Sequence, residues 1–217
     1  MDEYSSQNTK KRGYTSLKYF KISVHEIYAL VLIIIATVIR VNLAYQHWPL
    51  SNSDEGTIGI MALHIFSHGE HPIFFYGQNY MGATEAYLGA ALFHVFGASL
   101  FTLRLGLILL FVIFLISTYL VASMLYTKEV GLGSLFILSL GSIAVVSRQL
   151  LAIGGYAETI TCGSLAILLA LWLALSSQGT YYSERWQRLA GFGAWGLIVG
   201  LGIWSDILVL PSSAIAT

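Results

Sequence analysis

The sequence has little charge and only one cysteine. Charged residues make up 10% of its 217 residues, against roughly 25% in a typical soluble domain. The 11 basic and 11 acidic residues cancel, so no net field recruits nucleic acid, and the single Cys162 excludes a disulfide scaffold. The hydrophobic fraction of 56% and the aromatic fraction of 13% exclude an intrinsically disordered chain. We therefore expect an integral membrane protein.

Five apolar runs are each long enough to cross a bilayer, which takes about 20 residues. They cover residues 27–45, 102–126, 130–147, 157–175 and 189–210. The runs are continuously apolar and do not alternate, which argues against a β-barrel. A cleaved signal peptide is the alternative for the first run, but no small-residue cleavage site follows it. The pattern predicts an all-α polytopic transmembrane bundle over residues 27–210, after a basic cytoplasmic tail over residues 1–26.

Basic and acidic residues fall at opposite ends of these runs. With the N-terminus in the cytoplasm, most of the basic residues lie inside, as the positive-inside rule requires. The inner set is Lys10, Lys11, Arg12, Lys18, Lys21, Lys128, Arg185 and Arg188. The outer acidic set is Asp54, Glu55, Glu70, Glu85 and Glu158, with Asp206 near an outer helix end. We expect a protein of the prokaryotic plasma membrane whose active face lies outside the cytoplasm.

Residues 46–101 form the only long connection, and a loop of this length usually has a role. Stretches 56–67 and 86–96 look helical but are too short to span. Asp54 and Glu55 precede the first, where a helix N-terminus favours negative charge, and Gly97 is expected to end the second. We expect both helices to lie along the outer membrane interface. Together with the aromatic segment 71–82 between them, they would form a lid or wall that holds a polar headgroup.

The carboxyl groups of the outer face are candidates for general-base chemistry or cation binding. For Asp54 and Glu55, capping of the following helix is an equal alternative. Glu85 has the same alternative, and its functional role requires that it faces Asp54 across a shared cavity. Glu158 and Asp206 stand in or beside apolar runs, where ionisable groups are costly and indicate function by default. For Asp206, pairing with a helix neighbour is the alternative.

The basic and histidine residues of the outer face are less specific. Arg148 at a membrane surface suits a phosphate, with snorkelling toward the headgroups as the alternative. His64 and His68 have metal-ligand spacing on a helix, with Glu70 and His71 nearby. No partner motif accompanies them, so interface histidines explain them better and a divalent metal stays an open question. Segment 191–196 matches G-x-G-x-x-G but lies in an apolar run, where close helix packing explains the glycines.

An ordered set of residues in the long loop resembles a known family. The set is Asp54-Glu55, the segment Phe-Tyr-Gly-Gln-Asn-Tyr-Met-Gly over 75–82, Glu85, and the stretch 96–105 from Phe-Gly to Arg-Leu. With the single helix before it, this order resembles the membrane glycosyltransferases of the GT-C type. The nearest members are the protein O-mannosyltransferases of glycosyltransferase family 39 and the aminoarabinose transferases of lipid A. The resemblance covers about residues 20–210, the N-terminal part of the family fold.

The resemblance implies transfer of a sugar from a polyprenyl-phosphate donor to a lipid, glycan or protein acceptor on the outer face, usually with inversion at the anomeric carbon. The implied catalytic acids are Asp54, Glu55 and Glu85, and the implied contacts of the donor phosphate are Arg148 and Arg104. The implied substrate cavity contains Glu158, Tyr76, Gln78, Tyr80 and Tyr156. The Lys-Pro-Pro-Leu that often follows the second acid in the family is absent, and residues 86–88 read Ala-Tyr-Leu.

Two other hypotheses stay open. The first is a non-catalytic polytopic membrane protein, such as part of a transporter or an assembly factor. Transporters place their sites near the bilayer midplane with broken helices, whereas the charges here gather at one outer surface and the runs look unbroken. The second is an inactive fragment in which residues 211–217 are a truncated end, because members of the family carry more helices.

Overall fold

The computed structural model describes residues 23–177 and 185–215, and the regular elements in these ranges are all helical. They are α1 (Val24–Tyr45), α2 (Ser53–His68), α3 (Thr84–Phe96), α4 (Leu100–Leu125), α5 (Lys128–Leu140), α6 (Ile143–Leu150), α7 (Tyr156–Ser177), α8 (Arg185–Ser205), the short 3₁₀ helix η1 (Ile207–Val209) and α9 (Leu210–Ile215). Within the expected tail over 1–26, Lys10, Lys11, Arg12, Lys18 and Lys21 lie outside the described residues.

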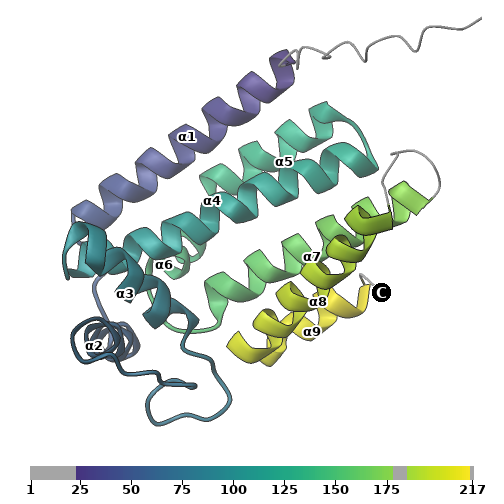
Figure 1. The fold of residues 1–217 in the computed structure, drawn as a ribbon. Coiled ribbons are helices and arrows are strands. Elements are labelled where there is room, and N and C mark those ends of the chain that lie inside the picture. Colours follow the sequence, from purple (N-terminus) through teal and green to yellow (C-terminus); the bar gives the residue numbers. More distant parts are fainter. Residues whose placement is uncertain (1–22, 178–184, 216–217) are drawn as a thin grey trace, which may run out of the picture.

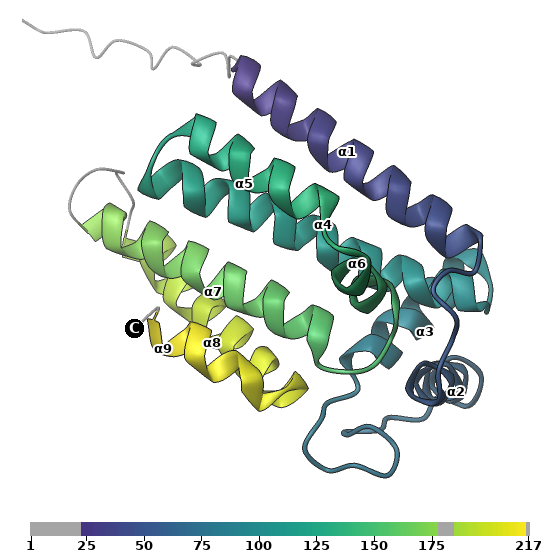
Figure 2. The same ribbon diagram turned by 180° about the vertical axis from the view of Figure 1, so that it is seen from behind.

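Helices α1, α4, α7 and α8 are each long and apolar enough to cross a membrane, and α5 with α6 would make a fifth span if the pair counts as one. The expected all-α bundle of about five spans is confirmed at this level. Figures 1 and 2 show the long helices running side by side. The start of α1, the α4–α5 turn and the start of α8 lie at one end, which we call the tail end. Helices α2, α3 and α6 lie at the opposite end, which we call the loop end.

The third apolar run is not one continuous helix, so the span expected over 130–147 is wrong in this respect. Helix α5 ends at Leu140, α6 begins at Ile143, and the two axes differ by 82°. Gly141 has a φ of 56°, a conformation that glycine adopts at low cost and that ends the helix. The Ser142 side chain then accepts a hydrogen bond from the Val145 backbone N–H and caps α6. With 13 residues, α5 is about 20 Å long, which is shorter than a hydrocarbon core of about 30 Å.

The last apolar run also ends early. Helix α8 stops at Ser205, and Asp206 takes an extended conformation with a φ of −162°. Its side chain caps η1 by accepting a hydrogen bond from the Leu208 backbone N–H at 2.8 Å. The G-x-G-x-x-G match at 191–196 lies inside α8, so the strand–turn–helix context of a dinucleotide site is absent there.

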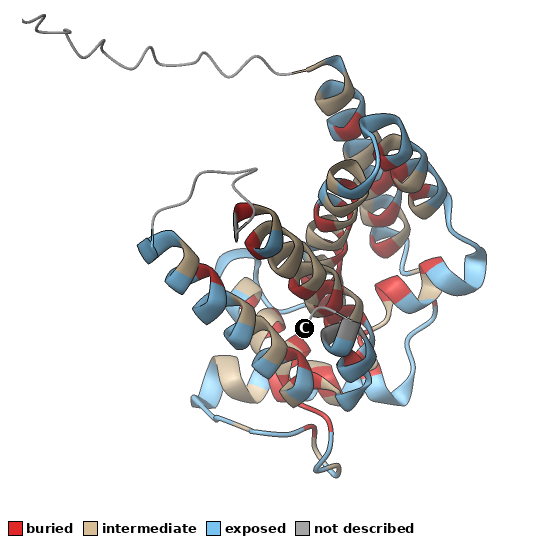
Figure 3. Ribbon diagram, turned by 90° about the vertical axis from the view of Figure 1, so that its right-hand side faces the viewer, coloured by how far each residue is buried: buried red, intermediate tan, exposed pale blue. Residues whose placement is uncertain are grey.

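Buried residues line the contacts between helices, and exposed ones face outward (Figure 3). One core cluster joins α2, α3 and α4 at the loop end, and it continues to Ala152 and Ala157 before and within α7. A second joins α1, α4 and α5 further along the bundle. Large apolar side chains of α1 that face away from the other helices are exposed, among them Ile35 and Ile39. An exposed apolar face of this extent suits contact with lipid.

Candidate functional site at the loop end

The loop end contains the predicted site residues, and the neighbours Asp54 and Glu55 have different surroundings there. Asp54 is exposed in the first turn of α2. The cap of α2 is Asn52, whose side-chain oxygen accepts a hydrogen bond from the Glu55 backbone N–H at 2.9 Å. The alternative that Asp54 caps α2 is therefore wrong, because Asn52 is the N-cap. Asp54 remains an accessible carboxylate beside a helix N-terminus.

Glu55 is buried and bound to Arg104 of α4. Arg104 Nε donates to Glu55 Oε1 at 2.9 Å, and Arg104 Nη2 donates to Glu55 Oε2 at 2.8 Å. The same Nη2 also donates to the Pro49 carbonyl oxygen at 2.8 Å. Both side chains are 0% exposed. In this arrangement the guanidinium neutralises Glu55 and joins α2 to α4, and neither group faces solvent as a free base or as a phosphate contact.

Glu85 of α3 does not face Asp54; its carboxyl group lies within hydrogen-bonding reach of the Glu158 carboxyl group of α7. Both side chains are buried. The Gly154 backbone N–H donates to Glu85 Oε2 at 3.1 Å, whereas Glu85 Oε1 and both oxygens of Glu158 receive no hydrogen bond from another group. Burial, and next the charge of Glu158, raise the pKa of Glu85 well above its usual value. Two negative charges this close together in the interior repel each other, which favours the state in which the pair holds a proton.

A tight glycine turn joins this pair to Asp206. Gly154 and Gly155 have φ values of 77° and 72°, which favour glycine. A Cβ atom at Gly155 would collide with the Asp206 side chain, so the turn and Asp206 are in close contact. The Thr159 hydroxyl donates to the Gly155 carbonyl oxygen. Carboxyl groups from α3, α7 and the cap of η1 therefore meet around one turn, a grouping that no spacing in the sequence predicted.

Arg148 is exposed at the end of α6. Its Nη1 donates to the Tyr156 hydroxyl at 3.4 Å, and its guanidinium lies 5.6 Å from the centre of the Tyr156 ring. Within residues 23–177 and 185–215 no carboxylate forms a salt bridge with it. Tyr156 is itself exposed. The predicted phosphate contact is thus an accessible cation held against an accessible aromatic ring.

The aromatic segment between α2 and α3 folds over His64. The Tyr76 hydroxyl donates to Glu70 Oε2 at 2.6 Å and lies 3.1 Å from His64 Nδ1. The bond to Glu70 raises the pKa of Tyr76. Tyr80 is exposed, and Gln78 is half-buried with an unpartnered Oε1.

These contacts replace the metal site that the histidine spacing suggested. His64 packs against the His68 ring, with 5.5 Å between ring centres. In the part of the chain that the structure describes, no group of three or more His, Cys, Asp or Glu residues is arranged to hold a metal ion.

Arg40 of α1 was not predicted as a site residue, yet its guanidinium makes several hydrogen bonds at the loop end. It is 1% exposed. Nε and Nη2 donate to Gln149 Oε1 at 3.0 and 2.8 Å, and Nη1 donates to the carbonyl oxygens of Ala36 and Ser139 at 3.1 and 3.2 Å. Its guanidinium also lies 3.8 Å from the centre of the Phe111 ring. The sequence did contain a signal for Arg40, because it lies within an apolar run, where ionisable groups are costly and indicate a role.

Comparisons of the chain with protein-family models, curated proteins and solved structures give no match. The family resemblance therefore stays a prediction that depends on the residues of the long loop.

Proposed function

We propose that this chain transfers a sugar from a polyprenyl-phosphate donor to a hydroxyl of a lipid, glycan or protein acceptor at the loop end, outside the cytoplasm. The observation that supports it best is the division of charge at this end. Glu55 and Arg104 neutralise each other in the interior, whereas Asp54 and Arg148 are exposed. Asp54 is an accessible carboxylate and Arg148 an accessible guanidinium, which are the two kinds of group that the transfer requires.

The proposed chemistry uses these two charges. In an inverting transfer, the acceptor oxygen bonds to the anomeric carbon while the bond from that carbon to the donor phosphate breaks. The Asp54 carboxylate takes the proton of the acceptor hydroxyl as a general base. The Arg148 guanidinium stabilises the charge that grows on the leaving polyprenyl phosphate. Tyr156, which contacts Arg148, and the exposed Tyr80 supply aromatic faces for the sugar.

The test is a transfer assay in proteoliposomes with a radiolabelled sugar on polyprenyl phosphate. We expect Asp54→Asn to reduce the transfer rate by about 10² to 10⁴, the usual contribution of a general base. Glu129→Gln is the control, since Glu129 is an exposed carboxylate at the tail end, away from the proposed site, and it should leave the rate unchanged. Equal transfer by wild type and Asp54→Asn would overturn the assignment of the base.

A second candidate function is supported by a different observation. The 82° break between α5 and α6 and the buried Glu85–Glu158 pair are features of transporters, which use broken helices and buried carboxyls to couple solute movement to protons. A proton flux into proteoliposomes that is abolished by Glu158→Gln, without any sugar transfer by the wild type, would favour this alternative.

A further inference from the structure

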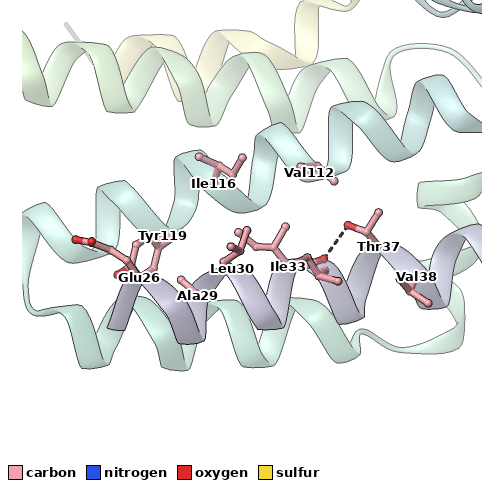
Figure 4. Close-up of a pocket in the computed structure, with 10 residues that line it drawn as sticks. Glu26, Ala29, Leu30, Ile33, Thr37, Val38, Val112, Ile116 and Tyr119 are labelled. Atoms are coloured by element: carbon pink, nitrogen blue, oxygen red, sulfur yellow. Dashed lines mark hydrogen bonds between the residues drawn. The ribbon is translucent and has the colours of Figure 1, made fainter. Parts of the chain in front are cut away.

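A groove of about 460 Å³ runs between α1 and α4, away from the loop-end residues discussed above (Figure 4). Its apolar lining includes Leu30, Ile33, Ile34, Val38, Val112 and Ile116. Thr37 also lines it, but its hydroxyl donates to the Ile33 carbonyl oxygen at 2.7 Å and is satisfied within α1. The groove therefore offers only apolar contact along most of its length.

The length of the groove matches one leaflet of a bilayer. Its lining on α1 extends from Glu26 to Val38, which corresponds to about 18 Å of helix. Half of a hydrocarbon core of about 30 Å is about 15 Å. An acyl chain of the leaflet at the tail end would fill this groove from the headgroup side inward.

The end of the groove at Glu26 and Tyr119 is polar (Figure 4). Tyr119 is 7% exposed, and its hydroxyl has no hydrogen-bond partner. An unsatisfied buried hydroxyl costs about 1 to 3 kcal/mol, so a ligand that accepts a hydrogen bond from it would be favoured. An ester carbonyl oxygen at the top of a lipid chain would be such an acceptor, because Tyr119 lines this end of the groove.

The charges around this end select the headgroup. Lys128 Nζ lies 2.9 Å from Glu26 Oε1, and His25 Nε2 lies 2.9 Å from Glu129 Oε1. All four side chains are partly exposed. Among the described residues, carboxylates and an ammonium therefore lie side by side at this end of the groove, which suits a headgroup that has a cation of its own as well as a phosphate.

We propose that the α1–α4 groove is a binding site for a phospholipid with an ethanolamine headgroup. One acyl chain fills the groove, the Tyr119 hydroxyl donates to an ester oxygen, Lys128 pairs with the phosphate, and Glu26 and Glu129 pair with the lipid ammonium. The site lies at the tail end, so it is independent of the sugar transfer proposed for the loop end.

The test uses the full chain in mixed vesicles with phosphatidylethanolamine that has a photoactivatable acyl chain, and counts covalent adducts on α1 and α4 by mass spectrometry. Ile34 and Ile35 are neighbours that are 50% and 51% exposed, but only Ile34 lines the groove. We expect Ile34→Trp to fill the groove and reduce labelling about tenfold, which corresponds to about 1.4 kcal/mol of lost affinity, while Ile35→Trp stays at the wild-type level. An equal effect of the two variants would overturn the proposal, because the labelled lipid would then be ordinary surrounding lipid.

The headgroup is tested with phosphatidylglycerol and phosphatidylcholine that have the same photoactivatable chain. We expect the ethanolamine lipid to label the groove more strongly than either, and Tyr119→Phe to reduce its labelling. Tyr119→Phe removes one hydroxyl that has no partner in the protein, so it should unfold at the wild-type temperature. Equal labelling by the three lipids, or unchanged labelling of Tyr119→Phe, would overturn the proposed recognition.

Discussion

Glu55 of α2 and Arg104 of α4 form a buried ion pair with two parallel hydrogen bonds, at 2.9 and 2.8 Å, and neither side chain reaches solvent. The residues are 49 positions apart in the chain. The Pro49 carbonyl oxygen accepts a third bond from the same guanidinium. This pair therefore joins the start of α2 and the segment before it to α4.

The first prediction concerns this pair. Glu55→Gln leaves the Arg104 guanidinium buried without a counter-charge, which costs about 3 to 5 kcal/mol. Replacing both Glu55 and Arg104 by methionine should lower the free energy of unfolding by less than the sum of the two single replacements. The reason is that the effects of mutations at residues in contact are not additive. The measurement is thermal unfolding in detergent.

Asp54→Asn is the control for this prediction, because Asp54 is the exposed neighbour of Glu55. It should change the stability by no more than about 0.5 kcal/mol. If Glu55→Gln proved as stable as Asp54→Asn, the pair would not hold the loop on the bundle.

The second prediction concerns the pH dependence of stability at Glu85. Its pKa is raised above the ordinary value of 4.5 by burial, and then by the charges of Glu158 and Glu55. The folded protein therefore binds this proton more tightly than the unfolded protein. The stabilisation is present below the unfolded pKa and is lost as the pH rises through the folded pKa.

Glu85→Gln removes this loss, because the amide is neutral at every pH. The variant should unfold at a higher temperature than wild type at pH 8, by about 3 to 5 °C for each unit by which the pKa is raised. The difference should shrink toward pH 5. Unfolding curves at several pH values would check it, and a Glu85→Gln profile parallel to that of wild type would contradict it.

The sequence predicted most of the helices because their signals are local. The long apolar runs, the two short helices before and after the aromatic segment, and the end of α3 at Gly97 all depend on composition and caps within a few residues. The break between α5 and α6 also had a local signal, since Gly141 followed by Ser142 is a helix stop followed by a helix cap. Because the residues on both sides of the break are apolar, the whole stretch was predicted as one continuous span.

The pairings of the site could not be predicted, because they join residues that are distant in the chain. Glu55 binds Arg104, Glu85 meets Glu158, and Arg40 binds Gln149, 109 positions away. The positions of these residues relative to the apolar runs show only that they lie at the same end of the bundle. Which group binds which partner depends on how α1, α2, α3, α4, α6 and α7 pack against one another, and the spacing of residues in one sequence does not give that packing.

The third prediction concerns Arg40, which joins α1 to the broken pair α5 and α6. Arg40→Met leaves Gln149 Oε1 and the Ser139 carbonyl oxygen without their donor, and each unsatisfied buried acceptor costs about 1 to 3 kcal/mol. We expect a lower unfolding temperature and faster labelling of a cysteine placed on α6, because α6 is released from α1. Arg148→Met, which removes an exposed cation of α6, is the matched control. If the cysteine on α6 is labelled at the same rate in both variants, Arg40 does not hold α6 against α1.

The last prediction tests the contact between the glycine turn and Asp206. Gly77 and Gly155 both have positive φ values, 82° and 72°, so alanine at either position has a similar backbone cost of about 1 to 2 kcal/mol. A Cβ atom at Gly77 would meet nothing within 4 Å, whereas one at Gly155 would collide with the Asp206 side chain. Gly155→Ala should therefore be less stable than Gly77→Ala by about 1 to 3 kcal/mol, the usual cost of overpacking.

Asp206→Ala in the Gly155→Ala background identifies the cause, because it removes the atoms that the new methyl group meets. This double variant should recover most of the lost stability, measured by thermal unfolding in detergent. Asp206→Ala alone removes the side-chain cap of η1 and should cost about 0.5 to 2 kcal/mol, so the recovery must be compared with that single variant. If Gly155→Ala matched Gly77→Ala, or if the second change restored nothing, Asp206 would not be packed on this turn, and its carboxyl group would not belong with those of Glu85 and Glu158.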